Sequence, residues 1–131
     1  MNQGRKVPAS GSFNGLQTMT APQNPDDAED RLAPLRPAYL RRLAQRRTEV
    51  ADAAAIAGER PFGDDELREI HRTAHSMGSS AAIYGYAQLS EAARAAERIL
   101  EDPESTPDVR TECLQHLARE AEAVLASQNQ P

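Results

Sequence analysis

Two histidines, His71 and His75, stand four residues apart near the middle of the chain. Residues at this spacing lie one turn apart on the same side of an α-helix, so one helix could carry both imidazoles. A neutral imidazole nitrogen is a competent nucleophile toward a phosphoryl group, and near pH 7 it is largely uncharged. Phosphoryl transfer otherwise demands mainly positioning and charge stabilisation, which a partner's metal ion and cationic groups can supply.

The same pair has two other interpretations, a metal site and an ordinary helix surface. A zinc site would need a third or fourth ligand from elsewhere in the chain. Metalloprotease-type pairs also carry a Glu directly after the first His, whereas Arg72 occupies that position here. Nothing in the sequence forms a Gly-rich loop between a strand and a helix, which argues against a nucleotide site.

An apolar stripe predicts the helix that carries the histidines. Its members recur at three- and four-residue steps: Leu67, Ile70, Ala74, Met77, Ala81 and Tyr84. His75 lies about 130° from the centre of this stripe, so we expect its ring to face water. The residues beside it are small, which would allow another protein to approach closely; they are Ser76, Gly78, Ser79 and Ser80.

Three further amphipathic segments, at about 36–58, 86–102 and 107–127, surround this helix in the sequence. We expect Asp64 or Asp65 to cap the second helix, Gly85 to make a tight turn after it, and Thr106 to cap the fourth. The apolar stripe of the fourth helix is predicted to be Val109, Cys113, Leu117, Ala121, Val124 and Leu125. Short connections between four such helices predict an all-α, antiparallel four-helix bundle over residues 35–127.

The ends of the chain lack this periodicity. Residues 1–34 are predicted to be a flexible tail, because they mix polar residues with Gly and Pro, and residues 128–131 to be a frayed C-terminus. No apolar run approaches a membrane span or a secretory signal. The lone Cys113 excludes an internal disulfide and is expected in the core, so we expect a cytoplasmic protein.

The net charge of −5 argues against a general nucleic-acid binder. The charge is uneven, however, because arginines gather in one region, at Arg31, Arg36, Arg41, Arg42, Arg46 and Arg47. A basic face on an acidic protein suits an acidic protein partner at least as well as nucleic acid. We therefore expect a monomer that binds proteins and neither nucleic acid nor membrane.

The run from Ala74 to Ala93, AHSMGSSAAIYGYAQLSEAA, resembles the core of histidine phosphotransfer (HPt) domains. These domains carry phosphoryl groups between histidine kinases and response regulators in multistep phosphorelays. The residues that follow the family pattern around the His are Ala74, Met77, Ser80, Gly85, Tyr86 and Leu89. Glu97 resembles the Glu that often closes the motif of the third helix.

The resemblance implies that His75 is the phosphorylated residue of a phosphocarrier that is not itself an enzyme. It implies receiver domains and a hybrid histidine kinase as partners, and no cofactor beyond the Mg²⁺ that a receiver domain holds. Gly78 and Ser79 stand where the family usually has Lys and Gly, and that Lys is thought to help hold the phosphoryl group. We expect Arg72 or Arg68, one and two turns before His75, to supply the missing charge.

His71 is expected to flank this site, together with Ser76, Gly78 and Ser79, and His116 to be a surface residue. Two competing hypotheses remain. In the first, the departures at Gly78 and Ser79 mark a degenerate HPt-like adaptor that binds receivers or kinases without phosphotransfer. In the second, His71 and His75 belong to a small metal-dependent enzyme.

Overall fold

A computed structural model describes residues 25–128 of the chain, which divides into two units, residues 1–35 and 36–131. In the first unit, helix α2 spans Pro25–Leu32 and a 3₁₀ turn, η2, spans Ala33–Leu35. These helical residues were not predicted from the sequence, and the flexibility of the segment stays a prediction. Residues 26–32 contain neither Gly nor Pro, and Pro25 is tolerated at the first helical position because its missing N–H would be unpaired there anyway. The rest of the predicted tail, residues 1–24, lies outside the described residues.

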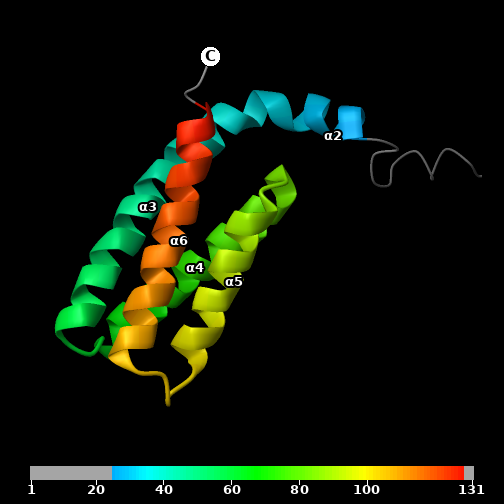
Figure 1. The fold of residues 1–131 in the computed structure, drawn as a ribbon. Coiled ribbons are helices and arrows are strands. Elements are labelled where there is room, and N and C mark those ends of the chain that lie inside the picture. The colour runs from blue at the N-terminus through cyan, green and yellow to red at the C-terminus, as the bar shows by residue number, and fades with distance from the viewer. Residues whose placement is uncertain (1–24, 129–131) are drawn as a thin grey trace, which may run out of the picture. The chain divides into compact units, whose positions relative to one another are not determined.

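The second unit is an antiparallel bundle of four helices: α3 (Arg36–Glu59), α4 (Asp64–Tyr84), α5 (Ala87–Glu101) and α6 (Pro107–Gln128). Helix α3 packs most extensively on α6, and α4 packs on α5 (Figure 1). Contacts of α5 with α6 and of α3 with α4 complete the bundle. The predicted all-α four-helix bundle is confirmed. The last helix ends at Gln128, and residues 129–131 are not described. No helix between residues 25 and 128 is both long and apolar enough to cross a membrane.

Alanine dominates the core of this bundle and lets its helices approach closely. The buried apolar side chains of α4 are those of the predicted stripe, Ile70, Ala74, Met77 and Ala81, while Leu67 and Tyr84 pack against the core partly buried. The other helices contribute Tyr39, Leu43, Val50, Ala53, Ala54, Ala57, Leu89, Ala92, Ala93, Ala96, Leu100, Leu114, Leu117 and Ala121. Since the apolar side of α4 is fixed in this core, its opposite side must face solvent.

The predicted stripe of α6 was wrong at one position. Leu114 is fully buried beside Leu117 and Ala121, whereas Val109 is 39% exposed. These two residues lie five positions apart, about 140° around the helix, so they cannot share one narrow stripe. Cys113 is half-buried, and burial raises the pKa of its thiol to about 11. The thiol therefore stays protonated at neutral pH.

Both ends of α4 are held by specific contacts. Before its first turn, the Gly63 amide donates to Glu66 Oε1 at 2.9 Å, so the expected capping by Asp64 or Asp65 was wrong; both lie in the first helical turn. Arg60 donates two hydrogen bonds to the Glu66 carboxylate, at 2.8 and 2.7 Å. The hydrogen bonds from Arg60 and then from the Gly63 amide lower the pKa of Glu66 to about 2.

At the other end, Gly85 has φ +85° and terminates α4 in the left-handed conformation. Its amide donates to the Ala82 carbonyl at 3.2 Å, and the Tyr86 amide donates to the Ala81 carbonyl at 2.9 Å. The predicted tight turn at Gly85 is confirmed. The turn reverses the chain directly into α5, so it sets which residues of α5 face α4.

Aromatic side chains join the first residues of α3 to this turn. Tyr39 stacks on Tyr84 with ring centroids 4.2 Å apart and on Tyr86 at 6.0 Å. The Arg36 guanidinium lies over both of the latter rings and donates to the Tyr86 hydroxyl at 2.7 Å. Burial raises the pKa of Tyr39 to about 12.

We expect Gly85→Ala to destabilise the bundle by about 1 kcal/mol, because an L side chain is disfavoured at positive φ. Apart from its chain neighbours, no atom of the described residues lies within 4 Å of the position of the added Cβ, so backbone strain would account for the loss. Urea unfolding should show the loss. Gly58→Ala is the matched control, because Gly58 lies within α3 and its added Cβ would make ordinary contact with Thr111 Oγ1 of α6 at 3.7 Å. Equal stability of the two variants would contradict the role given to Gly85.

Candidate functional site

His75 projects from the middle of α4 into solvent. Its neighbour Ala74 is fully buried and Met77 is 2% exposed, so the helix cannot rotate about its axis without uncovering the core. The side chain of His75 is 64% exposed. The exposure predicted from the helical period is confirmed, and the imidazole stands on a rigid element.

One nitrogen of this ring is held by α5. His75 Nδ1 lies 2.8 Å from Glu97 Oε2, and the Glu97 side chain is only 20% exposed. A carboxylate accepts hydrogen bonds, so the tautomer that fits this contact carries its proton on Nδ1 and a lone pair on Nε2. Nε2 makes no hydrogen bond with any residue between 25 and 128. The site therefore presents one nucleophilic nitrogen to solvent.

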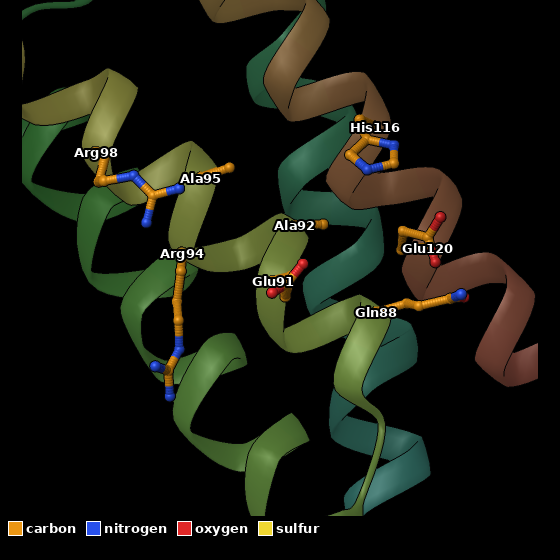
Figure 2. A pocket seen from close by; sticks show the side chains of 8 residues that line it. All are labelled: Gln88, Glu91, Ala92, Arg94, Ala95, Arg98, His116 and Glu120. Atoms are coloured by element: carbon orange, nitrogen blue, oxygen red, sulfur yellow. The ribbon is translucent and has the colours of Figure 1, made fainter.

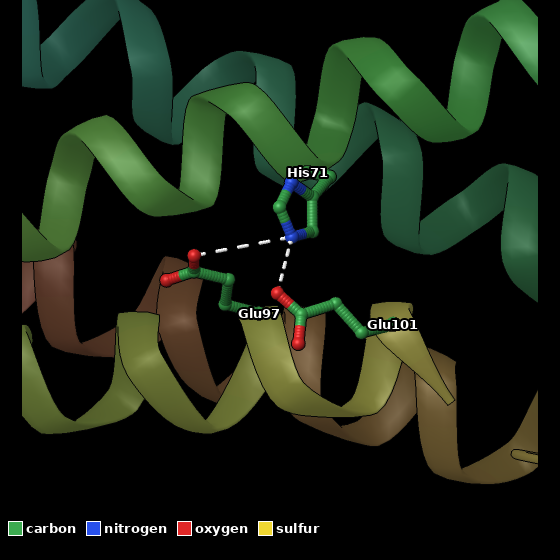
Figure 3. A group of neighbouring side chains, drawn as sticks. All are labelled: His71, Glu97 and Glu101. Carbon is green, nitrogen blue, oxygen red and sulfur yellow. Dashed lines mark hydrogen bonds and ion pairs between the residues drawn. The ribbon is translucent and has the colours of Figure 1, made fainter.

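His71 uses its other nitrogen. Its Nε2 lies 2.8 Å from Glu101 Oε2 and 3.9 Å from Glu97 Oε2 (Figure 3). The side chain of His71 is 34% exposed, half as accessible as that of His75. The structure thus places His71 beside the site, as expected, but with the outward nitrogen occupied by a carboxylate.

A cation could be shared by His71, Glu97 and Glu101, whose ligand atoms lie within 4.8 Å of one another. His75 does not belong to this group, so the hypothesis of a joint His71–His75 metal site gains no support from the geometry. The guanidinium groups of Arg68 and Arg72 lie along the same surface and oppose the binding of a cation. Hydrogen bonds between each imidazole and its carboxylate account for the arrangement without a metal ion.

Arg68 and Arg72 line a surface pocket with both histidines, which we call the His71 pocket. It measures about 660 Å³, and its other lining residues are Leu67, Glu97, Leu100 and Glu101. Each arginine is already in an ion pair on its own helix, Arg68 with Asp65 and Arg72 with Glu69 at 3.0 Å. All four side chains are largely exposed, so these pairs are weak and can be exchanged for a partner's carboxylate.

The small residues after His75 face three directions. The Ser76 hydroxyl accepts a hydrogen bond from Arg46 of α3. Gly78 is buried against α5, where Ser90 Oγ donates to its carbonyl at 2.9 Å. Ser79 is exposed. Only Ser79 is open to a partner, while Ser76 and Gly78 secure α4 to its two neighbours.

Sequence reasoning missed two arginines of α5. Arg94 and Arg98 line a second pocket, here called the Gly78 pocket, of about 420 Å³; its other lining residues are His75, Gly78, Ser79, Glu97 and Glu101. The Arg94 side chain crosses Gly78, with its Cγ 3.6 Å from the position that a Cβ of residue 78 would occupy. In the sequence both arginines belong to the polar side of α5, and the available signal was their spacing from Glu97.

Another pocket, of about 460 Å³, lies between α5 and α6, and Arg94 and Arg98 line it as well. Figure 2 shows His116 and Glu120 extending from α6, while Arg94 extends from α5 in the direction of α4. His116 is exposed, as predicted. His116 lies on a different helix from His75, and within residues 25–128 no hydrogen bond or ion pair links the two.

A family model described as Hpt domain matches residues 26–127, from within α2 to the last turns of α6. Neither the curated proteins nor the solved structures gave a significant match. The family match covers most of the chain and includes both histidines of α4 and the glutamates of α5. The chain therefore belongs to the Hpt domain family.

Proposed function

We propose that this chain is a histidine phosphotransfer protein of a multistep two-component phosphorelay. His75 accepts a phosphoryl group from the aspartate of one receiver domain and passes it to the aspartate of another. The observation that carries the proposal is the state of the His75 ring: Nδ1 is bound to Glu97 at 2.8 Å, while Nε2 has no hydrogen-bond partner between residues 25 and 128 on a side chain that is 64% exposed. A phosphocarrier needs one accessible nucleophilic nitrogen and nothing that would block the approach of a second protein.

The bond changes of the transfer step need only the His75 ring, the Glu97 carboxylate and the phosphorylated aspartate of the receiver. The lone pair of His75 Nε2 attacks phosphorus, an N–P bond forms, and the P–O bond to the receiver aspartate breaks, which releases its carboxylate. The proton on Nδ1 stays in place, so the ring becomes a phosphorylated imidazolium. The negative Glu97 carboxylate stabilises that new positive charge. The reverse sequence delivers the group to the next receiver.

The partner is expected to supply the rest of the chemistry. A Mg²⁺ ion on the receiver domain would neutralise charge on the transferring phosphoryl group, so this chain needs no cofactor of its own. We further propose a monomeric, cytoplasmic carrier with no kinase activity, served by a hybrid histidine kinase.

Docking would place the exposed side of α4 against the receiver. Arg72 lies between the His71 pocket and a pocket of about 350 Å³ toward α3, which Arg42 and Arg46 also line. Together with Arg68, these side chains would form a basic rim for the acidic site of a receiver. The ion pairs with Asp65 and Glu69 would open as the receiver's carboxylates replace them.

A degenerate adaptor is the second candidate. The observation in its favour is that residue 78 is a buried glycine and offers no cation next to His75. An adaptor would bind receiver or kinase domains through the same side of α4 without taking up phosphate.

Incubation with a ³²P-labelled phosphorylated receiver should transfer label to the wild-type chain in an acid-labile, base-stable form. His75→Gln should abolish the label, because it removes the nucleophilic nitrogen. His71→Gln is the matched control and should retain label, since His71 Nε2 is engaged by Glu101. Receiver binding without any label in the wild type would instead support the adaptor.

Glu97→Gln should slow phosphorylation of His75 by roughly tenfold or more. The amide oxygen can still accept the hydrogen bond from Nδ1, so the variant removes mainly the negative charge. Glu101→Gln serves as the control, because among the described residues the Glu101 carboxylate pairs with His71 and not with His75. Rapid-quench measurement would compare the transfer rates of the two variants. Equal rates would show that Glu97 does not stabilise the phosphorylated ring.

A further inference from the structure

We propose that Arg94 of α5, supported by Arg98, forms the binding site for the phosphoryl group carried by His75. This inference rests on the proposed function and identifies the cation that the carrier itself supplies. Both arginines line the Gly78 pocket together with His75, so all three residues border one surface depression.

The register between α4 and α5 places Arg94 within reach of the site. Glu97 meets His75 and Arg94 meets Gly78, so the two contacts follow one another along the antiparallel pair. Neighbouring turns of a helix are about 5.4 Å apart, a distance that an extended arginine side chain spans. Arg94 can therefore approach phosphate on Nε2 from the Gly78 side, opposite to Glu101.

The carboxylates of the Gly78 pocket pair with the histidines, so Arg94 and Arg98 are available to bind a phosphoryl group. Glu97 is bound to His75 and Glu101 to His71. Between residues 25 and 128, no hydrogen bond or ion pair engages Arg94 or Arg98. Arg68 and Arg72 differ, since each pairs with a carboxylate of α4. A phosphoryl group brings negative charge and three acceptor oxygens, which a guanidinium matches with two parallel N–H donors.

Gly78 contributes to the same site by leaving space for the Arg94 side chain. A Cβ at this position would lie 3.4 Å from Ala93 Cβ and 3.6 Å from Arg94 Cγ, so a longer side chain would compete with the arginine stem. The absence of a side chain at residue 78 thus gives Arg94 its path across α4. At this point a positively charged side chain could project from residue 78 of α4 or from α5, and in this chain it is Arg94 of α5.

The test uses the full chain and two phosphoryl donors. Potassium phosphoramidate phosphorylates histidine without a protein partner, and a phosphorylated receiver does so through docking. Arg94→Ala should lower the rate of His75 phosphorylation roughly tenfold with both donors, because a charge-assisted hydrogen bond to the phosphoryl group is lost. Arg119→Ala, an exposed arginine of α6, is the matched control and should behave as wild type with both.

Arg72→Ala separates docking from phosphoryl binding. Because Arg72 belongs to the proposed docking rim, its loss should slow transfer from the receiver more than it slows the phosphoramidate reaction. The same pattern for Arg94→Ala would overturn our inference, because it would make Arg94 a docking residue. Wild-type rates for Arg94→Ala with both donors would overturn it too, while labelled His75 would still support the carrier function.

A relocated cation provides the rescue experiment. The double variant Gly78→Lys, Arg94→Ala moves the positive charge from α5 to α4 and should recover most of the lost rate. Unchanged far-UV circular dichroism and thermal midpoint would exclude misfolding as the cause of any loss. Failure of the lysine to restore the rate would show that the charge is not what matters, and it would overturn the proposal. A wild-type chain that takes no label from either donor would overturn both this inference and the proposed function.

Discussion

The hydrogen bond between His75 Nδ1 and Glu97 Oε2, at 2.8 Å, is the interaction on which the site depends. It decides which ring nitrogen carries the proton, and it leaves the lone pair of Nε2 without a partner among the described residues. Glu97 can have this role because it is mostly shielded from water, so its charge is screened less than that of the exposed acids around it. The same contact joins α4 to α5, and any change in their register would break it.

Close packing sets that register. Gly78 lies against α5, Ser90 donates to its carbonyl, and Gly85 reverses the chain with a φ of +85° that few other residues adopt. The alanines of both helices keep the backbones near each other. A glycine inside a helix weakens the isolated helix by about 1 kcal/mol. Here the loss is offset by a contact that puts Glu97 level with His75.

The periodicity of single helices predicted much of this arrangement, but not the pairing between helices. The spacing of Ile70, Ala74 and Met77 sufficed to place His75 on the solvent side, because one helix determines its own faces. The contacts with Glu97 and Arg94 depend on how far α5 is shifted along α4, which neither amphipathic pattern contains. The helix Pro25–Leu32 was not predicted for another reason, since composition averaged over the whole N-terminal segment concealed a short helical run.

The two histidines of α4 show how such small shifts divide roles between like residues. Both project from the same side of one helix, and each meets a glutamate of α5 at 2.8 Å. His71 meets its glutamate through Nε2, the nitrogen farther from the backbone, whereas His75 meets Glu97 through Nδ1. The first contact uses up the nitrogen that could reach a partner, and the second orients the ring while it leaves that nitrogen open. The same kind of contact, an imidazole hydrogen-bonded to a carboxylate, therefore occupies Nε2 of His71 and leaves Nε2 of His75 available.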